Sequence, residues 1–78
     1  MDIRHRVGQN VKQYRKLRGW SQEELALEAD FHRTYISGIE RGIRNPTVTV
    51  IAQLAKVLRV KPGELLDGEG LRRRPKAR

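Results

Sequence analysis

The apolar residues of this 78-residue chain recur at intervals of three and four positions, which is the spacing of one face of an α-helix. The first series begins at Ile3 and continues through Leu17, and Gly19 is placed to end a helix just beyond it. The residues between these ends that complete the stripe are Val7, Val11 and Tyr14. We therefore predict a long amphipathic helix at the N-terminus.

A second, shorter helix is predicted directly after it. Ser21 and Glu24 have the spacing of a capping box, in which the serine hydroxyl accepts a hydrogen bond from the glutamate amide and the glutamate reaches back. The helix that follows ends near Asp30. Its short buried stripe is expected to be Leu25, Ala26 and Ala29.

Three further helices complete the pattern. One is expected from about His32 to Arg41, with Gly42 placed to end it. The chain breaks at 45–46, Thr47 then N-caps a fourth helix, and Pro62 stands at the first position of a short fifth. The inward-facing residues of the third and fourth helices are expected to be Ile36, Ile39, Val48, Ile51, Leu54, Ala55 and Leu58. With no strand-period segment and no internal repeat, the fold class is predicted to be all-α, a compact five-helix bundle.

The charge of the chain is distributed unevenly. The formal net charge is +8, but residues 71–78 alone contribute +5 and have a single apolar side chain worth burying. We therefore predict one folded domain over 1–67 and a basic, disordered tail over 68–78. Because the folded body is only about +3, its charge is weak support for nucleic-acid binding, and the tail is equally well a solubilising segment or a DNA-binding arm.

Composition excludes several classes of function. The chain has no cysteine, and its longest apolar run is three residues, far short of the roughly 20 that a membrane span needs. Its first residues lack the apolar stretch of a secretory signal, so we expect a cytoplasmic location. His5 and His32 are too isolated to hold a metal. No phosphate loop or nucleophile motif is present, and neither an enzyme nor a bound cofactor is expected.

The stretch from 22 to 40 is the most informative, because two short helices meet there across a turn of helix-turn-helix length. At this point the chain resembles the Cro/phage-repressor family, also called the xenobiotic-response-element (XRE) type. The blocks that carry the resemblance are SQEELA at 21–26, YISGIERG at 35–42, RNP at 44–46, LAKVL at 54–58 and LL at 65–66. The resemblance covers roughly 7–67 and implies a lambda-repressor-like DNA-binding domain.

This family resemblance also implies residue roles. The third helix is expected to lie in the major groove of DNA, with side chains near its start reading base edges. The base-reading candidates are Arg33, Thr34, Tyr35 and Ser37. The candidate phosphate contacts are Gln22, Ser21, Arg41, Arg44 and Asn45. Arg15 and Glu40 are expected to form a structural ion pair between the first and third helices.

Two positions depart from the family pattern. His32 occupies an N-cap where Ser, Thr, Asp or Asn is usual, so either the cap is weak or the histidine faces phosphate. Gly38 stands where many relatives carry a long polar side chain that reaches bases. We expect this glycine to limit the base-reading side chains of the helix to Arg33, Thr34, Tyr35 and Ser37.

The function that follows from the resemblance is a sequence-specific, double-stranded DNA-binding transcriptional regulator. One copy offers too few base-reading side chains to mark a site in a genome, so a homodimer is expected. The predicted dimer interface is Val50, Val57, Val60, Leu65 and Leu66. The stretch 33–41 is similar to restriction–modification controller proteins, and no small-molecule ligand is expected. The alternative is an antitoxin or other protein-interaction module of the same fold, with DNA binding secondary.

Overall fold

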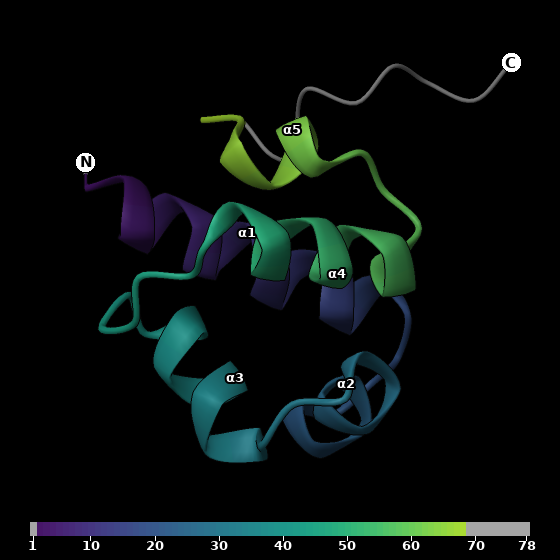
Figure 1. The fold of residues 1–78 in the computed structure, drawn as a ribbon. Coiled ribbons are helices and arrows are strands. Elements are labelled where there is room, and N and C mark those ends of the chain that lie inside the picture. The colour runs from purple at the N-terminus through teal and green to yellow at the C-terminus, as the bar shows by residue number, and fades with distance from the viewer. Residues whose placement is uncertain (1, 69–78) are drawn as a thin grey trace, which may run out of the picture.

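The computed structural model describes residues 2–68, and within that range every regular element is a helix (Figure 1). The helices are α1 (Ile3–Leu17), α2 (Gln22–Ala29), α3 (Arg33–Glu40), α4 (Val48–Leu58) and α5 (Pro62–Leu66). The all-α prediction is confirmed. The prediction of a disordered tail over 68–78 lies, except for Gly68, outside the described residues.

The helix ends follow from local capping interactions. Ser21 Oγ accepts from the Glu24 amide at 3.0 Å, and the Ser21 amide donates to Glu24 Oε1 at 2.7 Å, which is the predicted capping box. Thr47 Oγ1 accepts from the Val50 amide at 3.1 Å. Gly42 has a φ of 79°, a left-handed conformation that costs glycine little, and the chain leaves α3 there.

Helix α1 has a cap that the apolar pattern did not predict. Asp2 accepts from the Arg4 amide at 2.8 Å and from Arg4 Nη2 at the same distance. The side-chain hydrogen bond from Arg4 lowers the pKa of Asp2 to about 2. The carboxylate is therefore ionised at neutral pH, where it complements the partial positive charge of the helix N-terminus.

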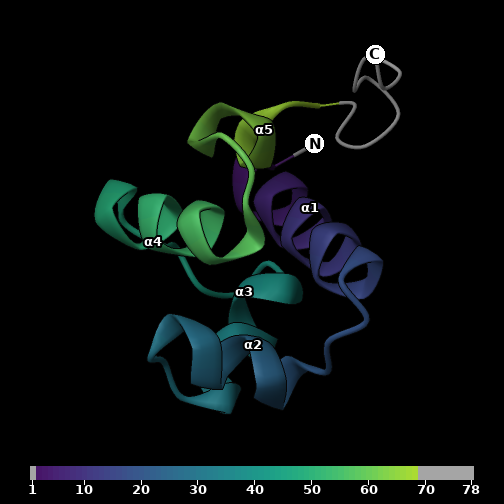
Figure 2. The same cartoon turned by 90° about the vertical axis from the view of Figure 1, so that its right-hand side faces the viewer.

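The helices surround a single core. Helices α2 and α3 form one end of the molecule, while α1, α4 and α5 form the other (Figures 1 and 2). Fully buried side chains come from all five helices, so each element depends on the others for burial. The largest of them are Tyr14, Leu25, Ile36, Ile39, Leu54, Leu65, Val7 and Val11.

Three residues of the predicted apolar stripes are exposed instead of buried. Ile3 is 49% exposed, Leu17 67% and Val48 84%. All three lie in the first or last turn of a helix. At 100° per residue, Leu17 and Val48 also fall on the flank of their stripes. The predictions that they face the core were therefore wrong.

One predicted interface residue is unavailable to a partner. Leu65 is completely buried in the core of its own chain, whereas its neighbour Leu66 is 41% exposed. A side chain with no exposed surface cannot contact a second copy, so the prediction of Leu65 as a dimer contact is corrected. Val50, Val57 and Val60 are half-buried and pack against the edge of the core.

Two buried contacts of α1 hold α3 and α5 in place. A Cβ atom at Gly8 would collide with the carbonyl oxygen of Ile39 and lie 2.7 Å from that of Glu40, so α1 crosses the last turn of α3 backbone against backbone. Asn10 Nδ2 donates to the carbonyl oxygens of Leu65 at 2.8 Å and Asp67 at 2.9 Å. These bonds satisfy carbonyls at the end of the short helix α5.

Candidate nucleic-acid interface

The turn between α2 and α3 sets the angle at which α3 leaves the body. Asp30 adopts a left-handed conformation, with φ 63° and ψ 44°, and the Phe31 amide donates to the carbonyl of Ala26 at 2.9 Å. The Phe31 ring is half-buried and meets the Tyr35 ring edge-on, with 5.4 Å between centroids. The first turn of α3 is therefore packed against the turn that precedes it.

Helix α3 has a buried face and an outward face. Ile36 and Ile39 are completely buried, as predicted, whereas Arg33 and Thr34 are exposed in the first turn. Tyr35 and Ser37 are half-buried. The structure thus brings the four predicted base-reading residues together at the solvent-facing start of one helix.

The N-terminus of α3 lacks a side-chain cap. His32 is the N-cap residue, but its side chain accepts no hydrogen bond from the helix amides. The cap is therefore weak, as the first alternative for His32 expected, and the second alternative, a contact with phosphate, stays a prediction. The His32 carbonyl accepts from the Tyr35 and Ile36 amides. The amides of the exposed residues Arg33 and Thr34, in the first turn, have no acceptor within the helix. Such amides are suited to binding an oxygen of a phosphate.

A buried ion pair joins the last residue of α3 to α1. Arg15 Nε donates to Glu40 Oε2 at 2.7 Å, and Arg15 Nη2 donates to Glu40 Oε1 at 3.0 Å. The two side chains are only 8% and 3% exposed. Arg15 Nη1 also donates to the carbonyl of Trp20 at 2.8 Å, which ties the pair to the segment between α1 and α2.

Gln22 connects this pair to the outward face. Its Nε2 donates to Glu40 Oε1 at 3.0 Å, and its Oε1 accepts a long hydrogen bond of 3.5 Å from Arg33 Nη1. The family resemblance had suggested only a phosphate contact for Gln22. The side-chain amide has two N–H groups, so the second remains available for a phosphate oxygen.

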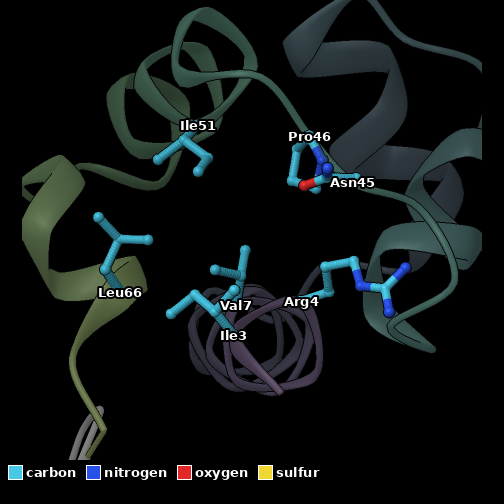
Figure 3. A pocket seen from close by; sticks show the side chains of 7 residues that line it. All are labelled: Ile3, Arg4, Val7, Asn45, Pro46, Ile51 and Leu66. Carbon is cyan, nitrogen blue, oxygen red and sulfur yellow. The ribbon is translucent and has the colours of Figure 1, made fainter.

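The other expected phosphate contacts lie near the ends of α2 and α3. Ser21, Arg41 and Asn45 are exposed, although the Ser21 hydroxyl is engaged in its capping box. Asn45 and Arg4 both line a depression between α1, α4 and α5 (Figure 3). The remaining residues that line it are Ile3, Val7, Pro46, Ile51 and Leu66.

Arg44 was predicted to contact phosphate from a position beyond the end of α3, but its side chain lies against that helix. Its Cγ lies 2.6 Å from the position that a Cβ of Gly38 would occupy. Its guanidinium carbon lies over the Tyr35 ring, 5.7 Å from the centroid. Gly38 is buried, and the space that a longer side chain at this position would take is occupied by Arg44. Sequence spacing carried no signal for this contact, because it depends on how the chain turns at Gly42.

Other kinds of site find no support in the described part of the chain. Residues 2–68 contain no group of three His, Cys, Asp or Glu side chains that could hold a metal ion. None of the helices described there has the length and apolar character needed to cross a membrane.

Comparison with known proteins identifies the family. A helix-turn-helix family model matches residues 11–65. Control protein C.BamHI of Bacillus amyloliquefaciens is 51% identical over 67 residues, which cover 85% of this chain and 83% of the relative. The solved structure of the restriction-modification controller protein C.AhdI from Aeromonas hydrophila gives a TM-score of 0.76 at 39% identity, over 80% of this chain and 94% of that one.

A second solved structure contains DNA. It is the complex of SinR, a master regulator for biofilm formation, with DNA, and it gives a TM-score of 0.75 at 42% identity, over 78% of this chain and 98% of that one. The resemblance predicted from the sequence, including the likeness to controller proteins, is confirmed. The chain therefore belongs to the XRE-type helix-turn-helix family, and its relatives there are transcriptional regulators and restriction-modification controller proteins.

Proposed function

We propose that this protein is a sequence-specific regulator of transcription that binds double-stranded DNA with α3 in the major groove. The observation that carries the proposal is the exposure of Arg33 and Thr34 at the start of a helix whose opposite face is locked into the core by Ile36 and Ile39. A rigidly held helix that presents polar side chains in its first turn is the arrangement that reads base edges in this family.

Each outward side chain of α3 has a chemistry suited to base or backbone contact. The Arg33 guanidinium has two donors for O6 and N7 of guanine, a contact worth about 1–3 kcal/mol of discrimination. Thr34 and Ser37 can hydrogen-bond to a base edge, and the methyl group of Thr34 can contact the methyl group of thymine. Tyr35 is assigned to the sugar-phosphate edge, because its ring is half-buried against Phe31.

A second group of residues would fix the position of α3 on the duplex. Gln22, Ser21, Arg41 and Asn45 are proposed to contact phosphates, with the open amides of the α3 N-terminus. Contacts of this kind set register and orientation and carry no sequence information. Their contribution falls as the salt concentration rises.

The protein is proposed to act as a homodimer through α4 and α5. Val50, Val57, Val60 and Leu66 contribute partly exposed apolar surface there, after the removal of Leu65 from the predicted set. Two copies of α3 would then read half-sites about one helical turn, roughly 34 Å, apart. The same proposal implies a non-enzymatic role, a cytoplasmic location, a DNA-binding unit over 1–67 and no cofactor.

Selection of binding sites from a duplex pool randomised over roughly 20 base pairs tests this function. The expected result is a two-fold symmetric consensus, and footprinting should then locate a matching site upstream of the protein's own gene. Recovery of unrelated sequences with equal affinity would contradict sequence-specific binding. Tight capture of a small neighbouring gene product, without a DNA consensus, would favour the protein-interaction alternative.

A further inference from the structure

Backbone hydrogen bonds hold Arg44 at the end of α3. The carbonyl oxygen of Gly38 accepts hydrogen bonds from the amides of both Ile43, at 3.0 Å, and Arg44, at 3.2 Å. These bonds close the chain back over the last turn of the helix. The Cα atom of Arg44 therefore lies next to α3, although Arg44 is four residues past the end of that helix.

The Arg44 side chain then crosses the surface of α3 at a position without a side chain of its own. A Cβ on Gly38 would lie 2.6 Å from Cγ of Arg44, 3.4 Å from Nε and 3.5 Å from Cδ. Its guanidinium carbon rests above the ring of Tyr35. A residue with a Cβ atom at position 38 would exclude this path, because the exposed Arg44 side chain would have to rotate away from α3 to avoid the collision at Cγ.

This path lies on the outward face of α3. At 100° per residue, Gly38 points away from the buried side chains of Ile36 and Ile39. Thr34 lies one turn earlier on the same face as Gly38, because residues four apart are neighbours on a helix. The stem of Arg44, which lies against Gly38, is therefore on the same face of α3 as Thr34.

Resting on the function proposed above, we propose that Arg44 is a specificity-determining residue that contacts a base through the gap left by Gly38. It supplies the long polar side chain that α3 itself lacks at position 38. A guanidinium in the major groove is matched to O6 and N7 of guanine, so the expected target is one G·C pair next to the bases read by Thr34. Within residues 2–68 no carboxylate forms an ion pair with Arg44, and its donors are free for this contact.

The test uses the randomised duplex pool and an unrelated duplex of equal length as probes, at one fixed salt concentration. Arg44→Ala should reduce discrimination at one base pair of each half-site by about 5- to 100-fold, with the other positions retained. Gly38→Ala should give the same loss at the same base pair, because its methyl group displaces the Arg44 stem. The double variant should be no worse than either single variant.

Control variants separate folding, charge and function. Gly38→Ala replaces a helical glycine by a better helix former, so its helix content and thermal midpoint should not fall. Lys12→Ala removes an exposed positive charge on α1 and should leave discrimination unchanged. Arg41→Ala should weaken binding to every duplex, the unrelated one included, as expected for a phosphate contact.

Two results would overturn the inference. Uniform weakening by Arg44→Ala, with every base preference retained, would make Arg44 a phosphate contact only. Unchanged preferences in Gly38→Ala would show that the glycine does not set the path of Arg44. Arg33→Ala distinguishes these outcomes from a failure of the proposed function: if it alters base preference while Arg44→Ala does not, only the inference fails. If wild-type protein selects no consensus, the proposed function itself fails.

Discussion

Arg15 and Glu40 form a buried, two-point ion pair that joins α1 to the last residue of α3. The carboxylate of Glu40 also accepts from Gln22 at 3.0 Å, so one charged group connects three helices. The pair lies at the opposite end of α3 from the proposed base contacts Arg33 and Thr34. It fixes the end of α3 while the turn at Phe31 fixes its start, and a helix held at both ends can present side chains at a constant angle.

Removal of one partner of this pair should destabilise the protein strongly. Arg15→Met leaves the Glu40 carboxylate buried without its cation, and Glu40→Gln leaves the Arg15 guanidinium without its anion. Each should lower the free energy of unfolding by about 3–5 kcal/mol, the usual consequence of an uncompensated buried charge. Urea denaturation followed by circular dichroism measures this change.

The double variant Arg15→Met with Glu40→Leu is the control for that prediction. Because it removes both charges and supplies apolar volume, it should be more stable than either single variant. The prediction fails if each single variant lowers the free energy of unfolding by less than about 1 kcal/mol. That value is typical of surface ion pairs, whereas this pair is buried.

Gly8 should be among the least replaceable residues in the chain. Gly8→Ala adds a methyl group that collides with backbone oxygens of Ile39 and Glu40, which cannot rotate away. We expect a loss of about 1–3 kcal/mol from overpacking, despite the better helix propensity of alanine. Gly63→Ala is the matched control, because a Cβ there meets no atom within 4 Å.

Thermal unfolding of the two alanine variants checks the prediction. Gly63→Ala should unfold at or slightly above the wild-type midpoint, and Gly8→Ala should unfold clearly below it. Equal midpoints would mean that α1 and α3 can separate at this crossing without cost, so that backbone contact does not fix their spacing.

Arg33→Ala should weaken binding to the selected site by about 1–3 kcal/mol and flatten the preference at one base pair. The reason is the loss of a two-donor contact to a base edge. Fluorescence anisotropy with the selected duplex and with single-base variants of it measures both effects. Unchanged affinity for the selected duplex would show that another surface reads the DNA.

Gln22→Ala provides the contrast to that variant. It should weaken binding to all duplexes similarly, because it removes a proposed phosphate contact and only a long, 3.5 Å support of Arg33. The Arg15–Glu40 pair keeps its own two hydrogen bonds in this variant, so the fold should be unaffected. A change in base preference would instead assign Gln22 to the positioning of Arg33.

Features that depend on neighbouring residues along the chain were predictable. Ser21, Thr47 and Pro62 signal helix starts through interactions within one turn, and the structure places starts at each of them. Burial at helix ends was not predictable: Ile3, Leu17 and Val48 continue the apolar spacing but are exposed, and spacing along one helix does not show where other helices pack against it. The apolar pattern registers only apolar residues, so it could not indicate that Asn10 is buried against the end of α5.

The candidate site also contains features that the sequence predicted and features that it did not. The exposed group at the start of α3 was predicted from its motif, since a motif is a local pattern. The path of Arg44 over Gly38 was missed, because it depends on the left-handed turn at Gly42 and on two amides that bond to one carbonyl. Spacing alone placed Arg44 beyond the helix, whereas its side chain lies upon it.

Leu66→Glu should dissociate the proposed homodimer and leave the fold intact. Leu66 is 41% exposed and lies on α5, beside the depression that Ile3 and Ile51 line, so a carboxylate there remains solvated in the monomer (Figure 3). In a dimer through α4 and α5 the same charge would be buried without a partner. That burial costs several kcal/mol and should raise the dissociation constant more than tenfold.

Light scattering across a concentration series, with wild-type protein at tens of micromolar, measures the oligomeric state. Two leucines serve as controls for Leu66→Glu. Leu27→Glu, at a residue 79% exposed on α2, should remain dimeric. Leu65→Glu should unfold, because that side chain is completely buried in its own chain. A monomeric wild type would remove the dimer from the proposal, and a dimeric Leu66→Glu variant would move the interface away from α5.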